Sequence, residues 1–217
     1  MPKKIAISMG DPNGIGPEII LKTLQKYNPE KATPVVFGRE DIFSETLERL
    51  KIDLPLKVID HPSEAQGNAI NLVQCVDESS SQLTVGRTSA VGGDNAMKAV
   101  EAGIDACMNG ETSALVTAPI SKEAITLAGY DVPGHTEFLA RKTSTDEVVM
   151  MLVSGDFRVA LATIHIPVRQ IADTLTKELL NTRLTILHTA LQKDFGIETP
   201  SIAVMGLNPH GGDGGVI

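Results

Sequence analysis

The sequence predicts an α/β protein with a mostly parallel sheet flanked by helices. Short apolar runs rich in β-branched residues alternate along the chain with amphipathic stretches long enough for helices, the pattern of a parallel sheet covered on its faces. The first unit is the clearest, since a strand at 3–9 leads through a glycine-rich loop at 10–16 into a helix at 17–27. Pro17 lies in the first turn of this helix, where no amide hydrogen is needed.

The remaining elements follow from the same alternation of patterns. Further strands are expected at 35–37, 114–117, 148–153, 158–166 and 201–207, and further helices at 94–108, 137–143 and 177–195. The stretch 62–87 is polar and is interrupted by Gly67 and by three serines at 79–81. We therefore expect an insertion or a crossing between subdomains there, without regular structure.

Composition excludes several classes of protein. A net charge of −8 and an aromatic content of 3% disfavour nucleic acid as a partner. The longest apolar runs, such as 148–153, are far shorter than the ~20 residues that cross a bilayer, and the N-terminus has no signal-peptide pattern, so no membrane association is expected. Cys75 and Cys107 form no CxxC pair, which favours a reducing cytoplasm. An anionic small molecule stays compatible with the charge, because helix termini, a few basic side chains or a metal ion can outweigh it locally.

Four predicted strands run at their carboxyl ends into polar, glycine-rich or proline-marked sequence. These segments are 10–18, 119–122, 165–167 and 208–215. Ligands of open α/β sheets bind at the carboxyl ends of the strands, so these groups could converge on one crevice. The loop at 10–16 lacks both the G-x-G-x-x-G order and the GK[ST] ending of phosphate loops, so a tight strand-to-helix turn is the simpler interpretation of it.

Two histidines at predicted strand ends indicate a divalent metal site. His165 stands at the end of one predicted strand, just before Ile166 and Pro167, and His210 follows the next predicted strand. Imidazole is a good ligand for zinc, cobalt and similar ions, although each histidine alone could equally be a hydrogen-bonded structural residue. Catalytic metal sites commonly use about three protein ligands. No third histidine is convincing, so Asp11, Asp213 or a group elsewhere would have to complete the site.

His135 is a candidate substrate-binding residue. It lies between Gly134 and Thr136, directly before a predicted helix. Thr136 could serve only as a helix cap, but this does not explain a histidine next to glycine. We therefore expect His135 to contact a substrate.

The other chemically interesting side chains have simpler interpretations. Lys122 follows a predicted strand and could face a carboxylate or phosphate, or could be solvated on the next helix. His61 and His188 are expected to be structural or solvated, the latter within an amphipathic helix. No serine occupies a G-x-S-x-G elbow, so a serine hydrolase is unsupported.

Six segments together closely resemble the 4-hydroxythreonine-4-phosphate dehydrogenases of pyridoxal phosphate biosynthesis. They are GDPNGIGPE (10–18), NGE (109–111), LVTAPISKEA (115–124), GHTEFLA (134–140), RVALATIHIP (158–167) and LNPHGGDGG (207–215). The first is also similar to the opening loop of isopropylmalate and isocitrate dehydrogenases. This implies a related fold with the site in the cleft between two domains, which we expect at 1–130 and 131–217, the second being incomplete at its C-terminal end.

The resemblance also implies a reaction. It is the NAD-dependent (or NADP-dependent), metal-assisted oxidation and decarboxylation of 4-phosphohydroxy-L-threonine to 3-amino-2-oxopropyl phosphate, a step toward pyridoxine 5'-phosphate, with one zinc, magnesium or cobalt ion. Residue by residue, it implies that His165 and His210 bind the metal and that His135 and Thr136 touch the substrate.

The resemblance further implies that the site is shared across a homodimer. The third metal-binding histidine of the family comes from the partner subunit, and it lies beyond residue 217 together with the family's Lys, Asn and Arg substrate contacts. We therefore expect these 217 residues to lack the family's C-terminal portion and a closed site. A dehydrogenase of a phosphorylated sugar acid, such as erythronate or threonate 4-phosphate, and a catalytically inactive fragment are the alternatives.

Overall fold

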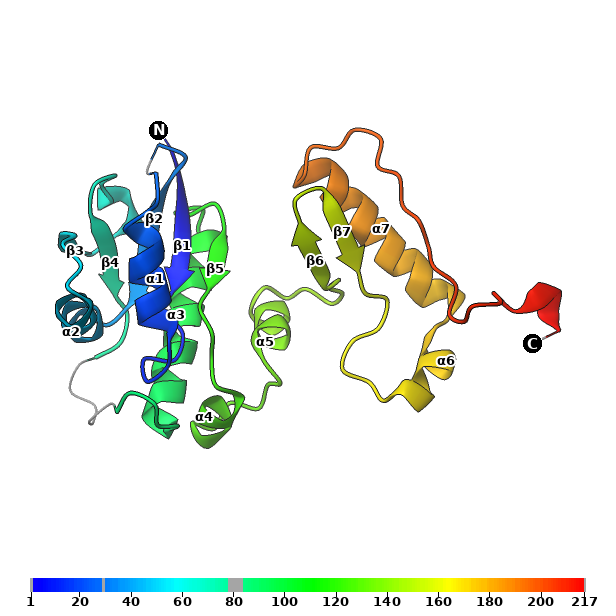
Figure 1. The fold of residues 1–217 in the computed structure, drawn as a ribbon, viewed down its shortest axis with the longest axis horizontal. Coiled ribbons are helices and arrows are strands. Elements are labelled where there is room, and N and C mark those ends of the chain that lie inside the picture. The colour runs from blue at the N-terminus through cyan, green and yellow to red at the C-terminus, as the bar shows by residue number, and fades with distance from the viewer. Residues whose placement is uncertain (1, 29, 78–83, 217) are drawn as a thin grey trace. The chain divides into compact units, whose positions relative to one another are not determined.

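The computed structural model describes residues 2–28, 30–77 and 84–216 (Figure 1). Contacts within the chain divide it into two compact units, Met1–Asp146 and Glu147–Ile217, which we call unit 1 and unit 2. Residues 131–146 pack with unit 1, where the ring of Phe138 contacts that of Tyr130 edge to face at 6.2 Å between centroids. This grouping of contacts does not define domains, so the domain boundary after residue 130 stays a prediction.

Unit 1 is built on a five-stranded sheet in which every neighbouring pair is parallel, as the alternating pattern predicts. The strands are β1 (Lys3–Ser8), β2 (Ala32–Gly38), β3 (Leu56–Ile59), β4 (Ile70–Gln74) and β5 (Leu115–Thr117), in the order β3-β4-β2-β1-β5. Ile7 of β1 aligns with Val36 of β2 on one side and with Val116 of β5 on the other.

Helices cover both faces of this sheet. The first face meets α1 (Gly16–Leu24) and α2 (Glu40–Leu50), since Val36 packs with Leu21 and Phe43. The opposite face meets α3 (Ala90–Met108), because the adjacent Val35 clusters with Ala106. Successive residues of a strand point to opposite faces, so the run of apolar residues in β2 is buried on both sides.

Two shorter helices pack against α3. They are α4 (Lys122–Leu127) and α5 (His135–Lys142). Ile125 of α4 and Phe138 of α5 share one buried cluster with Met97 and Val100 of α3. The helix α3 thus connects the sheet to the segment that carries His135.

The approach of α3 to α4 depends on Gly93. A Cβ atom at this position would lie 2.1 Å from the backbone oxygen of Ala124, which cannot move without displacing α4. We expect Gly93→Ala to lower the free energy of unfolding of unit 1 by about 1–3 kcal/mol, the usual cost of overpacking. Urea denaturation followed by circular dichroism measures it. Gly134→Ala is the matched control, because its new Cβ would come no closer than 3.9 Å to Glu137 Oε2, and an equal loss in both variants would contradict the explanation.

Unit 2 has a much smaller core. It contains the antiparallel hairpin β6 (Met151–Ser154) and β7 (Phe157–Ala160), the short α6 (Ile171–Thr174), the long α7 (Lys177–Lys193) and the 3₁₀ turns η2 (Val168–Gln170) and η3 (Asp213–Gly215). Among the residues of this unit that the structure describes, Leu191, at 6% exposure, is the only large hydrophobic side chain that is buried. Arg158 stacks on Phe195 at 4.5 Å from the ring centroid and so fixes the hairpin to the end of α7.

Two strands of the second half were predicted too generously. The prediction for 158–166 was wrong beyond Ala160, where β7 ends, and the prediction of a strand at 201–207 was wrong, because no partner strand pairs with it among the described residues. His165 and His210 therefore lie in loops and not at strand ends. A β-rich apolar run supplies side chains for a strand but not the neighbour that pairs with its backbone.

The expectation of an irregular stretch at 62–87 was wrong in part. It contains β4, which the buried Asn71 conceals from the apolar pattern. The Asn71 amide donates to the backbone oxygens of Pro34 and Gln66 at 3.1 and 2.9 Å, so this polar residue stabilises the strand instead of interrupting it. Residues 78–83 of the stretch lie outside the described part. The sequence also failed to predict α2 and β3.

No helix in the described ranges is both long and apolar enough to cross a membrane.

Candidate functional site

The loops that follow β1 and β5 meet at the carboxyl edge of the sheet. β2 lies on one side of β1, and the chain later returns to place β5 on the other side. The strand order therefore reverses between β1 and β5, and α/β proteins commonly bind ligands at such a reversal. The amide of Asp11 donates to the Pro119 oxygen at 2.9 Å. Gly10 has φ +71°, and a Cβ there would lie 2.4 Å from the same oxygen. The structure thus brings together two of the four polar segments, 10–18 and 119–122.

The polar side chains of the glycine-rich loop face the N-terminal turn of α3. Asn13 Nδ2 donates to Ser89 Oγ at 3.0 Å, and Asn13 Oδ1 accepts from the amide of Thr84 at 2.8 Å. Ser89 caps α3 by accepting from the amide of Gly92. This clamp between Asn13 and Ser89 joins positions 76 apart in the chain, and the sequence alone did not predict it. The loop is therefore the tight structural turn, and its side chains order α3.

Asp11 belongs to the same clamp. Only 7% of Asp11 is exposed, and its Oδ1 accepts from the amide of Asn13 at 2.9 Å. A Cβ on Gly92 would lie 2.8 Å from that oxygen, so the carboxylate sits against the positive end of the α3 dipole. Burial raises the pKa of this carboxyl, and the hydrogen bond from Asn13 opposes the shift. A carboxylate buried in this way is a weak candidate for the missing metal ligand.

His135 begins α5 with a ring nitrogen that has no partner. Its Nε2 is buried without a hydrogen bond, and burial lowers the pKa of the imidazole, which favours the neutral form. Gly134 occupies the N-cap position, so the alternative in which Thr136 caps the helix is wrong. A neutral imidazole with one unused nitrogen can donate to or accept from a bound ligand.

The burial of His135 predicts a pH dependence of stability. The folded pKa lies below the unfolded value of about 6.5, so the unfolded chain binds more protons between these two values. The free energy of unfolding of unit 1 should therefore fall as the pH drops from about 6.5 to the folded pKa of His135. Below the folded pKa, the contribution of His135 to this free energy should become constant. NMR titration of the His135 ring measures the folded pKa, and denaturation of His135→Asn at matched pH isolates its share. A His135 pKa at or above the unfolded value would contradict the burial argument.

The two predicted metal ligands both lie in unit 2. His210 Nδ1 is 3.4 Å from Asp213 Oδ2, and both side chains are more than half exposed. His165 is exposed and has φ +57°, in the left-handed region that few residues other than glycine adopt. Within the described ranges, no group of three or more His, Cys, Asp or Glu side chains could hold a metal ion. The pair of histidines and Asp213 offer suitable donor atoms, and any complete site needs ligands from elsewhere.

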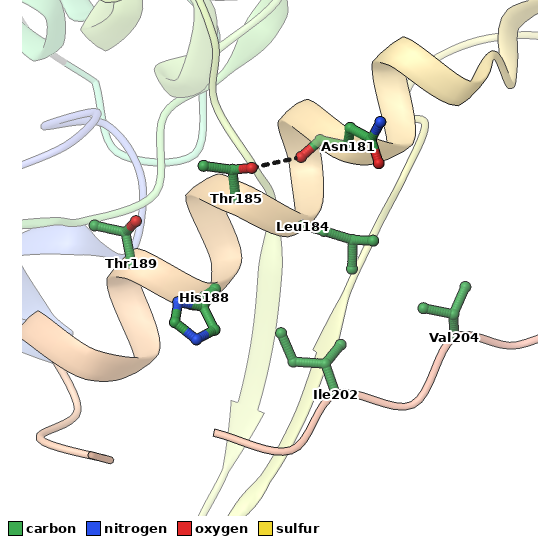
Figure 2. Close-up of a pocket in the computed structure, with 7 residues that line it drawn as sticks. All are labelled: Asn181, Leu184, Thr185, His188, Thr189, Ile202 and Val204. Carbon is green, nitrogen blue, oxygen red and sulfur yellow. Dashed lines mark hydrogen bonds between the residues drawn. The ribbon is translucent and has the colours of Figure 1, made fainter. Parts of the chain in front are cut away.

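The remaining candidates have structural or solvated surroundings. Lys122 is exposed at the start of α4. His61 caps the 3₁₀ turn η1 (Pro62–Glu64), and its Nε2 lies 3.2 Å from Glu111 Oε1. His188 lines an open groove beside α7, which the sequence did not predict (Figure 2).

Together these features define a class: an α/β protein with a parallel sheet, a glycine-rich turn at its strand-order reversal, and histidines on separate loops. The family model of the pyridoxal phosphate biosynthetic protein PdxA matches residues 30–217. The chain therefore belongs to this family.

Similar proteins agree with this assignment. The chain is 40% identical to a 4-hydroxythreonine-4-phosphate dehydrogenase of Chromobacterium violaceum over 99% of its length and 65% of the relative, and 38% identical to one of Bacteroides thetaiotaomicron over 99% and 59%. A crystal structure of that enzyme from Klebsiella pneumoniae has a TM-score of 0.89 at 36% identity, over 100% of this chain and 66% of that one. The chain thus spans about three fifths to two thirds of the length of these relatives, and these 217 residues lack the rest.

Proposed function

We propose that the protein represented by these residues catalyses the NAD-dependent (or NADP-dependent) oxidation and decarboxylation of 4-phosphohydroxy-L-threonine to 3-amino-2-oxopropyl phosphate. The observation that carries the proposal is the match of essentially the whole chain, at 36 to 40% identity, to proteins named for this dehydrogenase activity. The reaction forms part of pyridoxine 5'-phosphate biosynthesis in the cytoplasm. Both cysteines are free, in keeping with a reducing compartment.

His135 and Thr136 bind the substrate in this proposal. The Nε2 atom of His135 is buried and without a partner, and burial keeps the ring neutral. A neutral ring can hydrogen-bond a substrate oxygen without adding a charge to the site. Thr136, in the first turn of α5, places a hydroxyl next to it.

His165 and His210 hold one divalent ion, zinc, magnesium or cobalt. Two observations support this assignment. Both imidazoles, which are good ligands for such ions, lie in one unit, and His165 has a left-handed backbone, a strained conformation that is common at functional sites. Asp213 lies close enough to Nδ1 of His210 to orient its ring, as carboxylates commonly do for metal-binding histidines. A bound ion would make the substrate hydroxyl easier to deprotonate and would stabilise the enolate formed on decarboxylation.

The remaining ligands and substrate contacts come from outside these residues. Within the described part of the chain, no group of three or more His, Cys, Asp or Glu side chains could hold an ion by itself. We propose that the unmatched portion of the family and the partner subunit of a homodimer complete each site.

Substrate preference tests the proposed reaction. We define the chimera as residues 1–217 joined to the portion of the Klebsiella pneumoniae relative that they do not match. Its kcat/KM should be at least about tenfold higher for 4-phosphohydroxy-L-threonine than for erythronate or threonate 4-phosphate, since loss of one buried polar contact costs at least that much. The opposite preference would reject the proposed substrate. The fold alone does not decide, because a Burkholderia xenovorans structure at 27% identity and TM-score 0.70 is described as a terephthalate 1,2-cis-dihydrodiol dehydrogenase.

A further inference from the structure

The chain contains two Asn-Gly pairs, and the structure places them in opposite surroundings. They are Asn13-Gly14, in the glycine-rich loop, and Asn109-Gly110, at the end of α3. In an Asn-Gly pair the backbone nitrogen of the glycine can attack the side-chain amide of the asparagine, because glycine has no side chain to obstruct the approach. The surroundings of each pair therefore decide which asparagine can react.

The side chain of Asn13 is held in place. Only 3% of Asn13 is exposed, and its side-chain amide donates to Ser89 Oγ and accepts from the Thr84 amide. The nitrogen that would attack, that of Gly14, donates to the Asp11 oxygen at 3.0 Å. Rotation of the side chain toward this nitrogen would break both of its hydrogen bonds inside the protein, so the folded structure protects Asn13.

The side chain of Asn109 has no such restraint. Asn109 and Gly110 are both exposed, and within the described ranges no hydrogen bond holds the Asn109 side chain. A Cβ atom built on Gly110 would have no heavy atom within 4 Å apart from its neighbours in the chain. The side chain of Asn109 can therefore turn toward the Gly110 nitrogen without losing a contact and without meeting an obstacle.

The backbone of this second pair is held at the end of a helix. Asn109 is the C-cap of α3, with ψ −4°, and its neighbour Gly110 has φ +74°. The Gly110 amide donates to the Cys107 oxygen at 3.0 Å. The Glu111 amide donates to the Ala106 oxygen at 2.9 Å, which completes the Schellman pattern of a helix terminus. The attack requires this turn to open, and helix ends open far more readily than the interior of a protein.

We propose that Asn109 is a site of spontaneous deamidation in the folded protein and that Asn13 is not. The Gly110 nitrogen forms a bond to Cγ of Asn109, the bond from Cγ to Nδ2 breaks, and Nδ2 leaves as ammonia with the proton of the attacking amide. Water then opens the resulting succinimide at either of its carbonyl groups, which gives aspartate or isoaspartate. The reaction needs no reactant besides water, and the inference is independent of the proposed dehydrogenase activity.

The product changes the end of α3. A carboxylate replaces a neutral amide at the negative end of the helix dipole, two residues before Glu111. Isoaspartate also adds one carbon atom to the backbone of the Schellman turn. Both changes destabilise the last turn of α3, from which the chain continues into β5.

Peptide mapping by mass spectrometry tests the proposal. The chimera is kept folded at mildly alkaline pH, and the two Asn-Gly peptides are followed for the mass increase that accompanies conversion of an amide to an acid. Asn109 should react at least about tenfold faster than Asn13, because a helix end opens at a lower free energy than a buried loop. In urea, where neither pair is held, the two rates should agree within about threefold. Equal rates in the folded chimera, or faster conversion of Asn13, would overturn the proposal.

Two substitutions in the chimera test the two parts of the explanation. Asn109→Gln lengthens the side chain by one methylene group, which disfavours ring closure, and should abolish the mass increase of that peptide. Ser89→Ala removes the hydroxyl that accepts from Asn13 Nδ2, and should speed conversion of Asn13 while leaving the rate at Asn109 unchanged. A mass increase that persists after Asn109→Gln would contradict the assignment of the site. An unchanged rate at Asn13 after Ser89→Ala would contradict the protection by the clamp.

Discussion

Replacing His165 or His210 by alanine in the chimera is expected to abolish stoichiometric binding of a divalent ion and to lower kcat/KM by at least about 1,000-fold. Loss of one of about three protein ligands removes most of the affinity of a catalytic site, and even the partners that orient such ligands are commonly worth 10 to 100-fold. Metal content after dialysis and NADH formation measure the two effects.

The control for these substitutions is His188→Ala. His188 lies on α7 in the lining of the groove, away from the loops of His165 and His210 in the sequence. This variant should keep its metal and its turnover. Metal loss of equal size in all three variants would contradict the assignment.

The 217-residue chain by itself is expected to produce no NADH above background from 4-phosphohydroxy-L-threonine, while the chimera turns it over. The physical reason is the lack of a third metal donor among the described residues, together with the open apolar surface of unit 2. Spectrophotometry at equal concentrations of both proteins, with added zinc, magnesium or cobalt, gives the comparison. Robust turnover by the 217-residue chain would contradict the claim that its site is incomplete.

The sequence predicted the strands of unit 1 that contain an uninterrupted apolar run. β1, β2 and β5 follow from the runs at 5–7, 35–37 and 114–116, and their parallel pairing follows from the helices between them. β4 was missed because Asn71 interrupts its pattern, and its compensating hydrogen bonds to Pro34 and Gln66 are visible only in three dimensions. The segment 201–207 shows the converse error, since the pairing of a strand depends on a neighbouring strand that the local sequence does not specify.

Residue types and spacing predicted some of the candidate site residues but not the contacts between distant segments. His135 stood out because a glycine precedes it, and the structure adds a buried, unpartnered ring nitrogen. The turn containing Asp11 has the tight strand-to-helix geometry that the sequence favoured. The hydrogen bond from Asn13 of this turn to Ser89 joins residues 76 positions apart, so no local sequence pattern could indicate it. A third metal ligand, which we propose lies outside these residues, could not be predicted from them.

The most direct test of the proposed metal centre is a crystal structure of the chimera grown with cobalt, with the ion located by its anomalous scattering. We predict one ion with a ring nitrogen of His165 and a ring nitrogen of His210 both at about 2.0–2.2 Å. An ion bound elsewhere, or two imidazoles too far apart to reach the same ion, would contradict the account.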